Sequence, residues 1–189
     1  MTQQPAIDPD RLMHDVELRW KLRQNGMLLV PTFLDEEFAE HLLTELTWHE
    51  THRPYAEVRL LLNVAGGKLP AILSVVDFVW SRRVRVATRV IGLAAGPAVL
   101  LAAAAARGMR SASVEARFFL NPIARLCPSP PDEWTPTAAA SLTMLTGRGD
   151  MHATQADLEA GLRFTPDEAC AYGLIDRVEP TDASLVPGL

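Results

Sequence analysis

Two histidines and one cysteine are the side chains of this sequence most readily tied to chemistry. His49 and His52 lie three positions apart near the end of a predicted helix, a spacing found in metal sites, but no third ligand lies nearby in the sequence. Cys127 is a potential nucleophile, yet no histidine stands near it in sequence to lower the pKa of its thiol. We interpret the histidines as solvated surface residues, expect neither a metal nor a cofactor, and assign Cys127 no catalytic role.

Lys68 and Asp157 are two further candidates. Lys68 directly follows a Gly66-Gly67 pair and could place a positive charge beside an anionic intermediate, although an exposed loop position is the commoner reason for such a lysine. Asp157 could act as an acid or a base. It also stands at the third position after Thr154, the pattern of a capping box, in which it would only stabilise the start of a helix.

The length and composition indicate one soluble globular domain. The chain has 189 residues, of which 48% are hydrophobic and 22% charged, enough for a sizeable core. Its formal net charge of −5 provides no positive field for a polyanion, so we expect no nucleic-acid partner. The most apolar stretch, residues 99–106, is followed by Arg107, well short of the ~20 apolar residues that a membrane span needs.

Two features of the sequence bear on its location. The two cysteines, Cys127 and Cys170, match no metal or redox spacing, which fits a reducing compartment. Residues 1–8 contain neither the basic region nor the apolar region of an export signal. We therefore predict a cytoplasmic protein with no membrane contact.

Short apolar runs alternate with amphipathic segments along the chain, a pattern that predicts a parallel sheet with helical crossovers. The run at 27–30 is continuous, so we expect a strand buried on both faces. In such a sheet, chemistry belongs at the carboxyl ends of the strands. The predicted strands cover residues 27–30, 57–63, 84–91 and 114–120, and the predicted helices cover residues 35–46, 69–80, with Trp80 facing inward, and 99–106.

The ends of the chain and one internal segment follow a different pattern. Residues 1–15 are polar and contain two prolines, so we expect a flexible tail before a single domain of residues 16–189. The proline-rich stretch 122–136 predicts a loop or flap without regular structure. Thr154 and Thr165 each look like the N-cap of a helix, and Gly173 like a C-cap that precedes a last strand.

Three segments resemble the ClpP family, the proteolytic subunits of Clp protease, within the ClpP/crotonase superfamily. Leu-Leu-Asn-Val-Ala-Gly-Gly at 61–67 is similar to the family's strand that ends in Asn-Ser-Pro-Gly-Gly, and Gly-Leu-Ala-Ala-Gly at 92–96 is similar to Gly-Gln-Ala-Ala-Ser. The stretch 168–178 resembles the family's Glu-Ala-X-X-Tyr-Gly-Leu-Val-Asp. The resemblance extends over residues 17–180 and implies an α/β fold, a ClpP/crotonase-like spiral of βαβ units.

The resemblance also implies a Ser-His-Asp triad and gives each triad position a residue of this chain. The serine position falls on Gly96, the histidine position on Asn121, 25 residues further on, and the aspartate position on Asp157. Acyl transfer needs a nucleophilic side chain and a base that takes its proton. Glycine has no such side chain, and an asparagine amide does not titrate near neutral pH. The implied triad therefore retains only its aspartate.

The backbone groups that would bind an oxyanion are also incomplete by this resemblance. In the family, the N–H of the residue after the nucleophile helps to bind the tetrahedral oxyanion, but here this residue is Pro97, which has no N–H. Losing one such donor costs about 10²–10³ in rate even with an intact triad. Gly66 and Gly67 are expected to keep the family's backbone turn, and their amides could still line a groove for an extended peptide.

Family members form seven-membered rings, and a handle that follows the catalytic histidine joins two rings. Here the handle, residues 123–153, is shortened and begins with several prolines, so we do not expect two rings to stack. The head region is present, and Trp48, Phe78 and Trp80 could form a contact patch on its helices. We expect a homo-oligomer or a mixed ring with an active ClpP-like paralogue.

Three functions are compatible with these observations. We favour a catalytically inactive ClpP-like subunit with a structural or regulatory role in a Clp-type assembly. The first alternative is a non-proteolytic enzyme that performs acyl chemistry on a small molecule in the degenerate cleft. It would use the backbone amides of Gly67 and Gly96, with Lys68 or Asp157 as acid or base. The second alternative is a module that binds a peptide along Gly66 and Gly67 without cleaving it.

Overall fold

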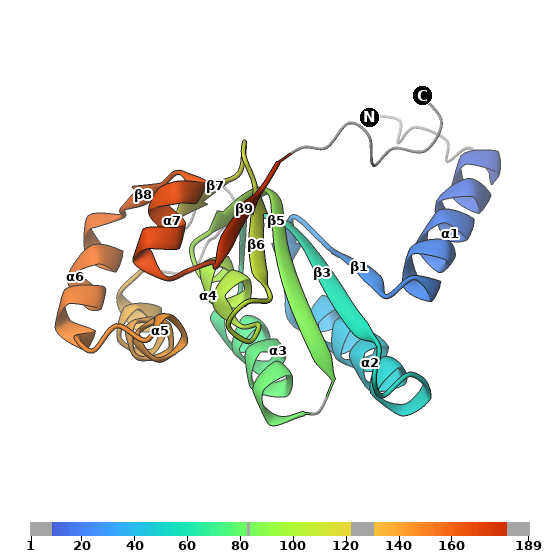
Figure 1. The fold of residues 1–189 in the computed structure, drawn as a ribbon, viewed down its shortest axis with the longest axis horizontal. Helices are drawn as coiled ribbons and strands as arrows, with labels where there is room; N and C mark the ends of the chain where they lie inside the picture. Colours follow the sequence, from blue (N-terminus) through green and yellow to red (C-terminus); the bar gives the residue numbers. More distant parts are fainter. Residues whose placement is uncertain (1–8, 83, 122–130, 181–189) are drawn as a thin grey trace, which may run out of the picture.

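The computed structural model describes residues 9–82, 84–121 and 131–180, and a seven-stranded sheet forms its centre (Figure 1). The strands of this sheet are β1 (Met27–Val30), β3 (Glu57–Val64), β5 (Arg85–Ala95), β6 (Arg110–Ser113), β7 (Arg117–Phe119), β8 (Arg163–Phe164) and β9 (Arg177–Glu179). The order is β1-β3-β5-β6-β9, while β7 pairs with β5 and β8. Only the pairing of β7 with β8 is antiparallel. The predicted α/β class with a parallel sheet is confirmed.

The helices lie in three places around the sheet. They are α1 (Pro9–Gln24), α2 (Glu36–His52), α3 (Leu69–Ser81), α4 (Ala98–Ala103), α5 (Pro131–Thr146), α6 (Met151–Ala160) and α7 (Pro166–Tyr172). Figure 1 shows α2, α3 and α4 along one side of the sheet, α5 to α7 gathered beyond β7 and β9, and α1 projecting past β1. Among the described residues, no helix is long and apolar enough to span a bilayer.

The core fills the space between the sheet and α2, α3 and α4. Every second residue of β3 is buried, including Leu60 and Leu62, because successive side chains of a strand point to opposite faces. Leu46 and Ile72 meet them from the helices and are fully buried. One face of the sheet is therefore covered by the chain itself.

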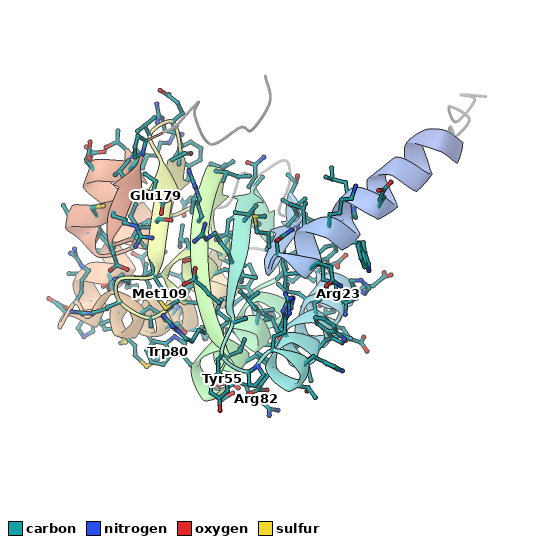
Figure 2. All side chains as sticks on the ribbon, turned by 45° about the vertical axis from the view of Figure 1, so that its right-hand side comes forward. Arg23, Tyr55, Trp80, Arg82, Met109 and Glu179 are labelled. Carbon is teal, nitrogen blue, oxygen red and sulfur yellow. The ribbon has the colours of Figure 1, made fainter. Side chains whose placement is uncertain are left out.

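The opposite face of the sheet is open in the single chain. Leu29 of β1 is 43% exposed and Ile91 of β5 is 45% exposed. On the same part of the molecule Arg89 forms an ion pair of 2.8 Å with Glu179, which Figure 2 labels. The expectation that residues 27–30 are buried on both faces is therefore wrong for this single chain, because the burial of β1 alternates and Leu29 is exposed.

The strand predicted at 114–120 is shorter in the structure, where only β7 lies within it, and a separate strand, β6, precedes it. β6 ends at Ser113, a turn follows in which the Ala116 N–H donates to the Ser113 carbonyl at 3.0 Å, and β7 then begins at Arg117. The sequence pattern missed β6 because its first residue is an arginine. Arg110 is 4% exposed and its guanidinium holds the carboxylate of Asp176, with Nε 3.0 Å from Oδ2. This ion pair makes a charged residue compatible with a central strand.

Two segments predicted to lack regular structure are helical where the structure describes them. α1 begins at Pro9, inside the predicted tail of residues 1–15, and residues 1–8 lie outside the described part. α5 begins at Pro131 and contains Pro136, so the predicted loop over 122–136 is wrong for its last six residues. Pro131 lies in the first turn, where its missing N–H would have no intrahelical partner, but Pro136 lies inside the helix, where proline is unfavourable.

The caps of the last two helices show one wrong and one correct prediction. α6 starts at Met151, because Asp150 is its N-cap and accepts from the N–H groups of His152 and Ala153 at 2.9 and 3.1 Å. Thr154 is therefore inside the helix. α7 begins as predicted with a capping box of Thr165 and Glu168, and ends at Gly173, whose φ is 93°.

Candidate functional site

The turn between β5 and α4 is where the resemblance would put the nucleophile. Gly96 has a φ of 57°, in the left-handed region that favours glycine, and Pro97 is already helical at φ −56° and ψ −22°. The Gly96 N–H donates to the carbonyl of Phe119 at 2.9 Å, and the Gly96 carbonyl accepts from the Val99 N–H at 3.1 Å. Both Gly96 and Pro97 are buried. The turn therefore has a fixed backbone and no reactive side chain.

Asn63 joins the ends of the two strands that carry the glycine segments. Its Oδ1 accepts from the Leu93 N–H at 3.1 Å, at the point where the register of β3 and β5 shifts. A Cβ at Gly92 would lie 2.5 Å from this oxygen, so β3 and β5 can lie this close together only because residue 92 is a glycine. Asn63 thus fixes the strand end before Gly66 against the strand end before Gly96.

Gly66 and Gly67 form β4, which pairs in parallel with β2 (Phe33–Leu34) in a second, two-stranded sheet. A Cβ at Gly67 would lie 2.7 Å from the carbonyl oxygen of Leu34 and 2.8 Å from the side chain of Ile72. The glycine is required here by the close approach of β2, independent of any ligand. The predicted turn at this place is thus a short paired strand.

Lys68 does not point its charge toward the turn at Gly96. Its Nζ lies 2.6 Å from Oε2 of Glu36, and both side chains are exposed. The hydrogen bond to Glu36 raises the pKa of Lys68 and lowers the pKa of Glu36. The interpretation of Lys68 as an exposed residue at the start of α3 agrees with this position, since its carbonyl accepts from the Ile72 N–H.

Asn121, to which the resemblance assigns the position of the catalytic base, follows β7 and is exposed. Its side chain lies against Gly161, where a Cβ would meet the amide group of Asn121. The Leu120 N–H donates to the Leu162 carbonyl at 2.9 Å, which holds the end of β7 beside the end of α6. Asn121 therefore lies beside the C-terminal end of α6, next to Gly161.

Asp157 has other partners. The hydroxyl of Tyr172 donates to Oδ2 of Asp157 at 2.8 Å, and Nη2 of Arg148 lies 3.5 Å from the same oxygen. The guanidinium of Arg148 stacks over the Tyr172 ring at 4.0 Å. Within the described residues, Asp157 shares no hydrogen bond with Asn121. The capping-box interpretation of Asp157 is wrong, because the residue lies in the second half of α6.

The Tyr172 hydroxyl is held in its protonated form. Burial raises the pKa of Tyr172 most, and its hydrogen bond to Asp157 raises it further. The phenol therefore stays a donor at any ordinary pH, and one carboxylate oxygen of Asp157 stays engaged as its acceptor. Phe164 packs against the same ring with centroids 4.7 Å apart. This arrangement stabilises the contact between α6 and α7 and offers no free acid or base.

The two histidines near the end of α2 occupy different environments. His49 is fully buried and neither ring nitrogen has a hydrogen-bond partner in the described structure, so its interpretation as a solvated residue is wrong. His52 is exposed, with Nδ1 2.9 Å from the Trp48 carbonyl. Among the described residues, no three His, Cys, Asp or Glu side chains lie close enough to hold a metal ion.

Of the two cysteines, Cys170 lies in the described part of the chain and its thiol is weakly reactive. Cys127 lies outside the described residues. Cys170 on α7 is half-buried, and burial raises the pKa of its thiol, with Asp167 and Asp176 acting in the same direction. A raised pKa keeps a thiol protonated and weakly nucleophilic.

Sequence reasoning missed the two residues that hold Asp157. Arg148 precedes α6, and Tyr172 was noted only as part of the family's Tyr-Gly-Leu segment. Neither has a local signal, because the contacts join residues on separate elements. The short antiparallel pairing of β7 with β8, which brings Phe164 beside Tyr172, was also missed.

Comparisons with known proteins agree with this architecture. The family model for Clp protease matches residues 11–127, more than half of the chain. An ATP-dependent Clp protease proteolytic subunit of Cyanophora paradoxa is 29% identical over 167 residues, which cover 84% of this chain and 86% of that protein. A chloroplastic ATP-dependent Clp protease proteolytic subunit-related protein 2 of Arabidopsis thaliana is 28% identical over 83% of this chain, although the match spans 60% of that longer protein. With the parallel sheet and the glycine turns described above, these matches show that the chain belongs to the Clp protease family.

Proposed function

We propose that this chain is a catalytically inactive ClpP-family subunit that serves a structural or regulatory role in a Clp-type assembly. The observation that carries the proposal is the turn at Gly96 and Pro97. It provides no side-chain oxygen or sulfur, and the residue after it has no N–H. Asn121 stands where a base would have to take the proton, and its amide cannot do so.

The contacts around the turn support the same proposal. The Gly96 N–H already donates to the Phe119 carbonyl, so this amide is engaged within the chain. The carboxylate of Asp157 accepts from Tyr172 and lies beside Arg148. A catalytic aspartate orients a histidine. Here the carboxylate orients a tyrosine instead, which is a structural task.

The groups on which the two alternative functions depend also form contacts within the chain. A non-proteolytic enzyme would need Lys68 or Asp157 as acid or base, and these residues are bound to Glu36 and Tyr172. A peptide-binding module would need the edge at Gly66 and Gly67, which pairs with β2. We therefore keep the inactive subunit as the proposed function.

The open face of the sheet supports a role in an assembly. Parallel sheets are normally covered on both faces. Here Leu29 and Ile91 stay exposed on the face that α2, α3 and α4 leave free. Burying such residues against another chain is favourable by about 25 cal/mol per Å² of apolar surface. A homo-oligomer or a mixed ring with an active ClpP-like paralogue would cover this face.

Three further parts of the proposal remain predictions. They are a single domain over residues 16–189 with a shortened handle at 123–153, a cytoplasmic location, and a degenerate cleft that could still hold a peptide or small molecule. In the handle, the described part consists of α5 and the start of α6. A shorter handle would disfavour the stacking of two rings.

Native mass spectrometry tests the proposed role directly. The purified chain is measured alone and after co-expression with an active Clp protease subunit, and each sample is assayed with a fluorogenic peptide substrate. We expect oligomers or mixed complexes that contain this chain, with hydrolysis only where the active subunit is present. A monomer in both samples would contradict the assembly role, and hydrolysis by the chain alone would contradict inactivity.

A further inference from the structure

A pocket of about 560 Å³ opens beside the first residues of β5. Gly96 follows the other end of this strand. Its walls come from the end of α3, the start of β5, residues 104–109 and α5. Val84 and Leu145, both buried, are among its apolar lining residues. None of the residues discussed for the candidate site lines this pocket, so it is a separate feature of the molecule.

The edge of the pocket carries large exposed side chains. Trp80 is 51% exposed and Met144 is 58% exposed, although the helical pattern predicted that Trp80 faces inward. Trp80 is held in place because its indole N–H donates to the Ala104 carbonyl at 2.8 Å. Figure 2 shows Trp80 and Met109 near each other on this side of the molecule, and both line the pocket. Tryptophan and methionine are enriched at binding surfaces.

The same edge is positively charged. Arg82, Arg85 and Arg107 line the pocket and are exposed, and among the described lining residues none is acidic. Arg82 has a distant acidic neighbour, with Nη1 3.8 Å from Oε2 of Glu50. Within the described part of the chain, neither Arg85 nor Arg107 forms an ion pair. In a chain with a net charge of −5, Arg85 and Arg107 therefore form a local region of positive charge.

We propose that this pocket binds a peptide segment of a partner protein in which acidic residues flank a large apolar side chain. The apolar side chain would lie on Val84 and Leu145 beside Trp80. The acidic residues would meet Arg85 and Arg107, which can hold carboxylates in bidentate fashion. A protein partner fits better than a small molecule because an apolar centre ringed by exposed charges is the anatomy of a protein interface. The proposal does not depend on the chain being an inactive subunit.

Fluorescence anisotropy with labelled peptides tests the proposal on the full chain. One pool contains octapeptides with Phe, Trp or Leu flanked by Asp and Glu, and a second pool has Lys in place of every acidic residue. We expect the acidic pool to bind at least tenfold more tightly than the basic pool. The variant Arg85→Gln/Arg107→Gln should weaken binding of the acidic pool at least tenfold, and Trp80→Ala at least fivefold.

Matched variants separate this pocket from general charge effects. Arg19→Gln/Arg59→Gln removes the same charge from two arginines outside the pocket and should leave binding within twofold of the original chain. Trp80→Phe keeps an aromatic ring and should bind better than Trp80→Ala. Circular dichroism checks that each variant is folded. Failure of the acidic pool to bind, equal losses in both double variants, or equally tight binding of a free aryl carboxylate would each overturn the proposal.

Discussion

The turn at Gly96 and the segment from Tyr172 to Asp176 both carry the family resemblance, but their residues do different things. At Gly96 the backbone path is fixed by hydrogen bonds while no side chain can react. In the second segment every distinctive residue makes a contact: Tyr172 with Asp157, and Asp176 with Arg110. Tyr172 and Asp176 thus hold the fold through side-chain contacts, whereas Gly96 does so through its backbone alone.

The largest expected effect comes from Asp176→Ala. The carboxylate accepts from Nε of Arg110 at 3.0 Å and from the Gly108 N–H at 2.7 Å, and its loss would leave a buried guanidinium without a countercharge. We expect the free energy of unfolding to fall by about 3–5 kcal/mol in chemical denaturation. Glu57→Ala, which breaks an exposed pair with Arg59, should cost at most about 1 kcal/mol. Similar losses for both variants would show that the buried pair of Arg110 and Asp176 contributes no more to the free energy of unfolding than an exposed pair.

The next effect is expected from Gly173→Ala. Gly173 has a φ of 93°, and a Cβ there would lie 3.0 Å from the Thr146 carbonyl oxygen, so strain and a close contact combine to cost about 1–3 kcal/mol. Gly108→Ala is the matched control, because its φ is 87° and nothing lies within 4 Å of the new Cβ. Thermal unfolding should therefore show the larger loss for Gly173→Ala. An equal loss would mean that α7 does not pack closely against the end of α5.

A smaller effect is expected from Tyr172→Phe. The variant removes the hydroxyl that donates to Asp157 but keeps the ring against Arg148 and Phe164, so the expected loss is about 0.5–1.5 kcal/mol. Asp157→Asn should show a comparable loss. In a double-mutant cycle the two changes should cost less together than the sum of the single losses. Strict additivity would show that Asp157 is not held by Tyr172 and is free for another role.

The smallest effect is a pH dependence that comes from neither of the two compared segments. Burial lowers the pKa of His49 below its usual 6.5, with Glu45 opposing the shift and Arg23 and Arg53 adding to it. Since the unfolded chain then takes up the proton first, the free energy of unfolding should fall as the pH drops below about 6.5. Denaturation curves at pH 7.5 and 5.5 measure this, and His49→Leu should reduce the difference. If His49→Leu shows the same difference in the free energy of unfolding between the two pH values, the pH dependence comes from other groups.

The sequence was sufficient to predict the parts of the fold that depend on local patterns. The strands at 27–30 and 57–63, the helices that follow them and the capping box at Thr165 all lie where periodicity and caps indicate. The glycine segments marked the turns that β3 and β5 lead into. These features are predictable because neighbouring residues determine them.

Features that depend on long-range contacts could not be predicted in this way. β6 begins with Arg110, whose burial makes sense only once Asp176 is beside it. The sequence alone suggested that Asp157 is a capping residue or a catalytic acid. Its actual partners, Arg148 and Tyr172, could not be inferred because they lie outside α6. The start of α5 at Pro131 was hidden because proline suits the first turn of a helix, whereas Pro136 lies inside the same helix, where proline is unfavourable. A composition rule cannot distinguish the two positions.

Intact mass after treatment with a fluorophosphonate tests the central claim most directly, since the reagent acylates an activated serine. The chain should keep its mass under conditions that fully label an active Clp protease subunit. Gly96→Ser should also stay unlabelled, because Asn121 cannot take the proton and Pro97 has no N–H to offer the oxyanion. One adduct per chain on the unmodified protein would contradict the account.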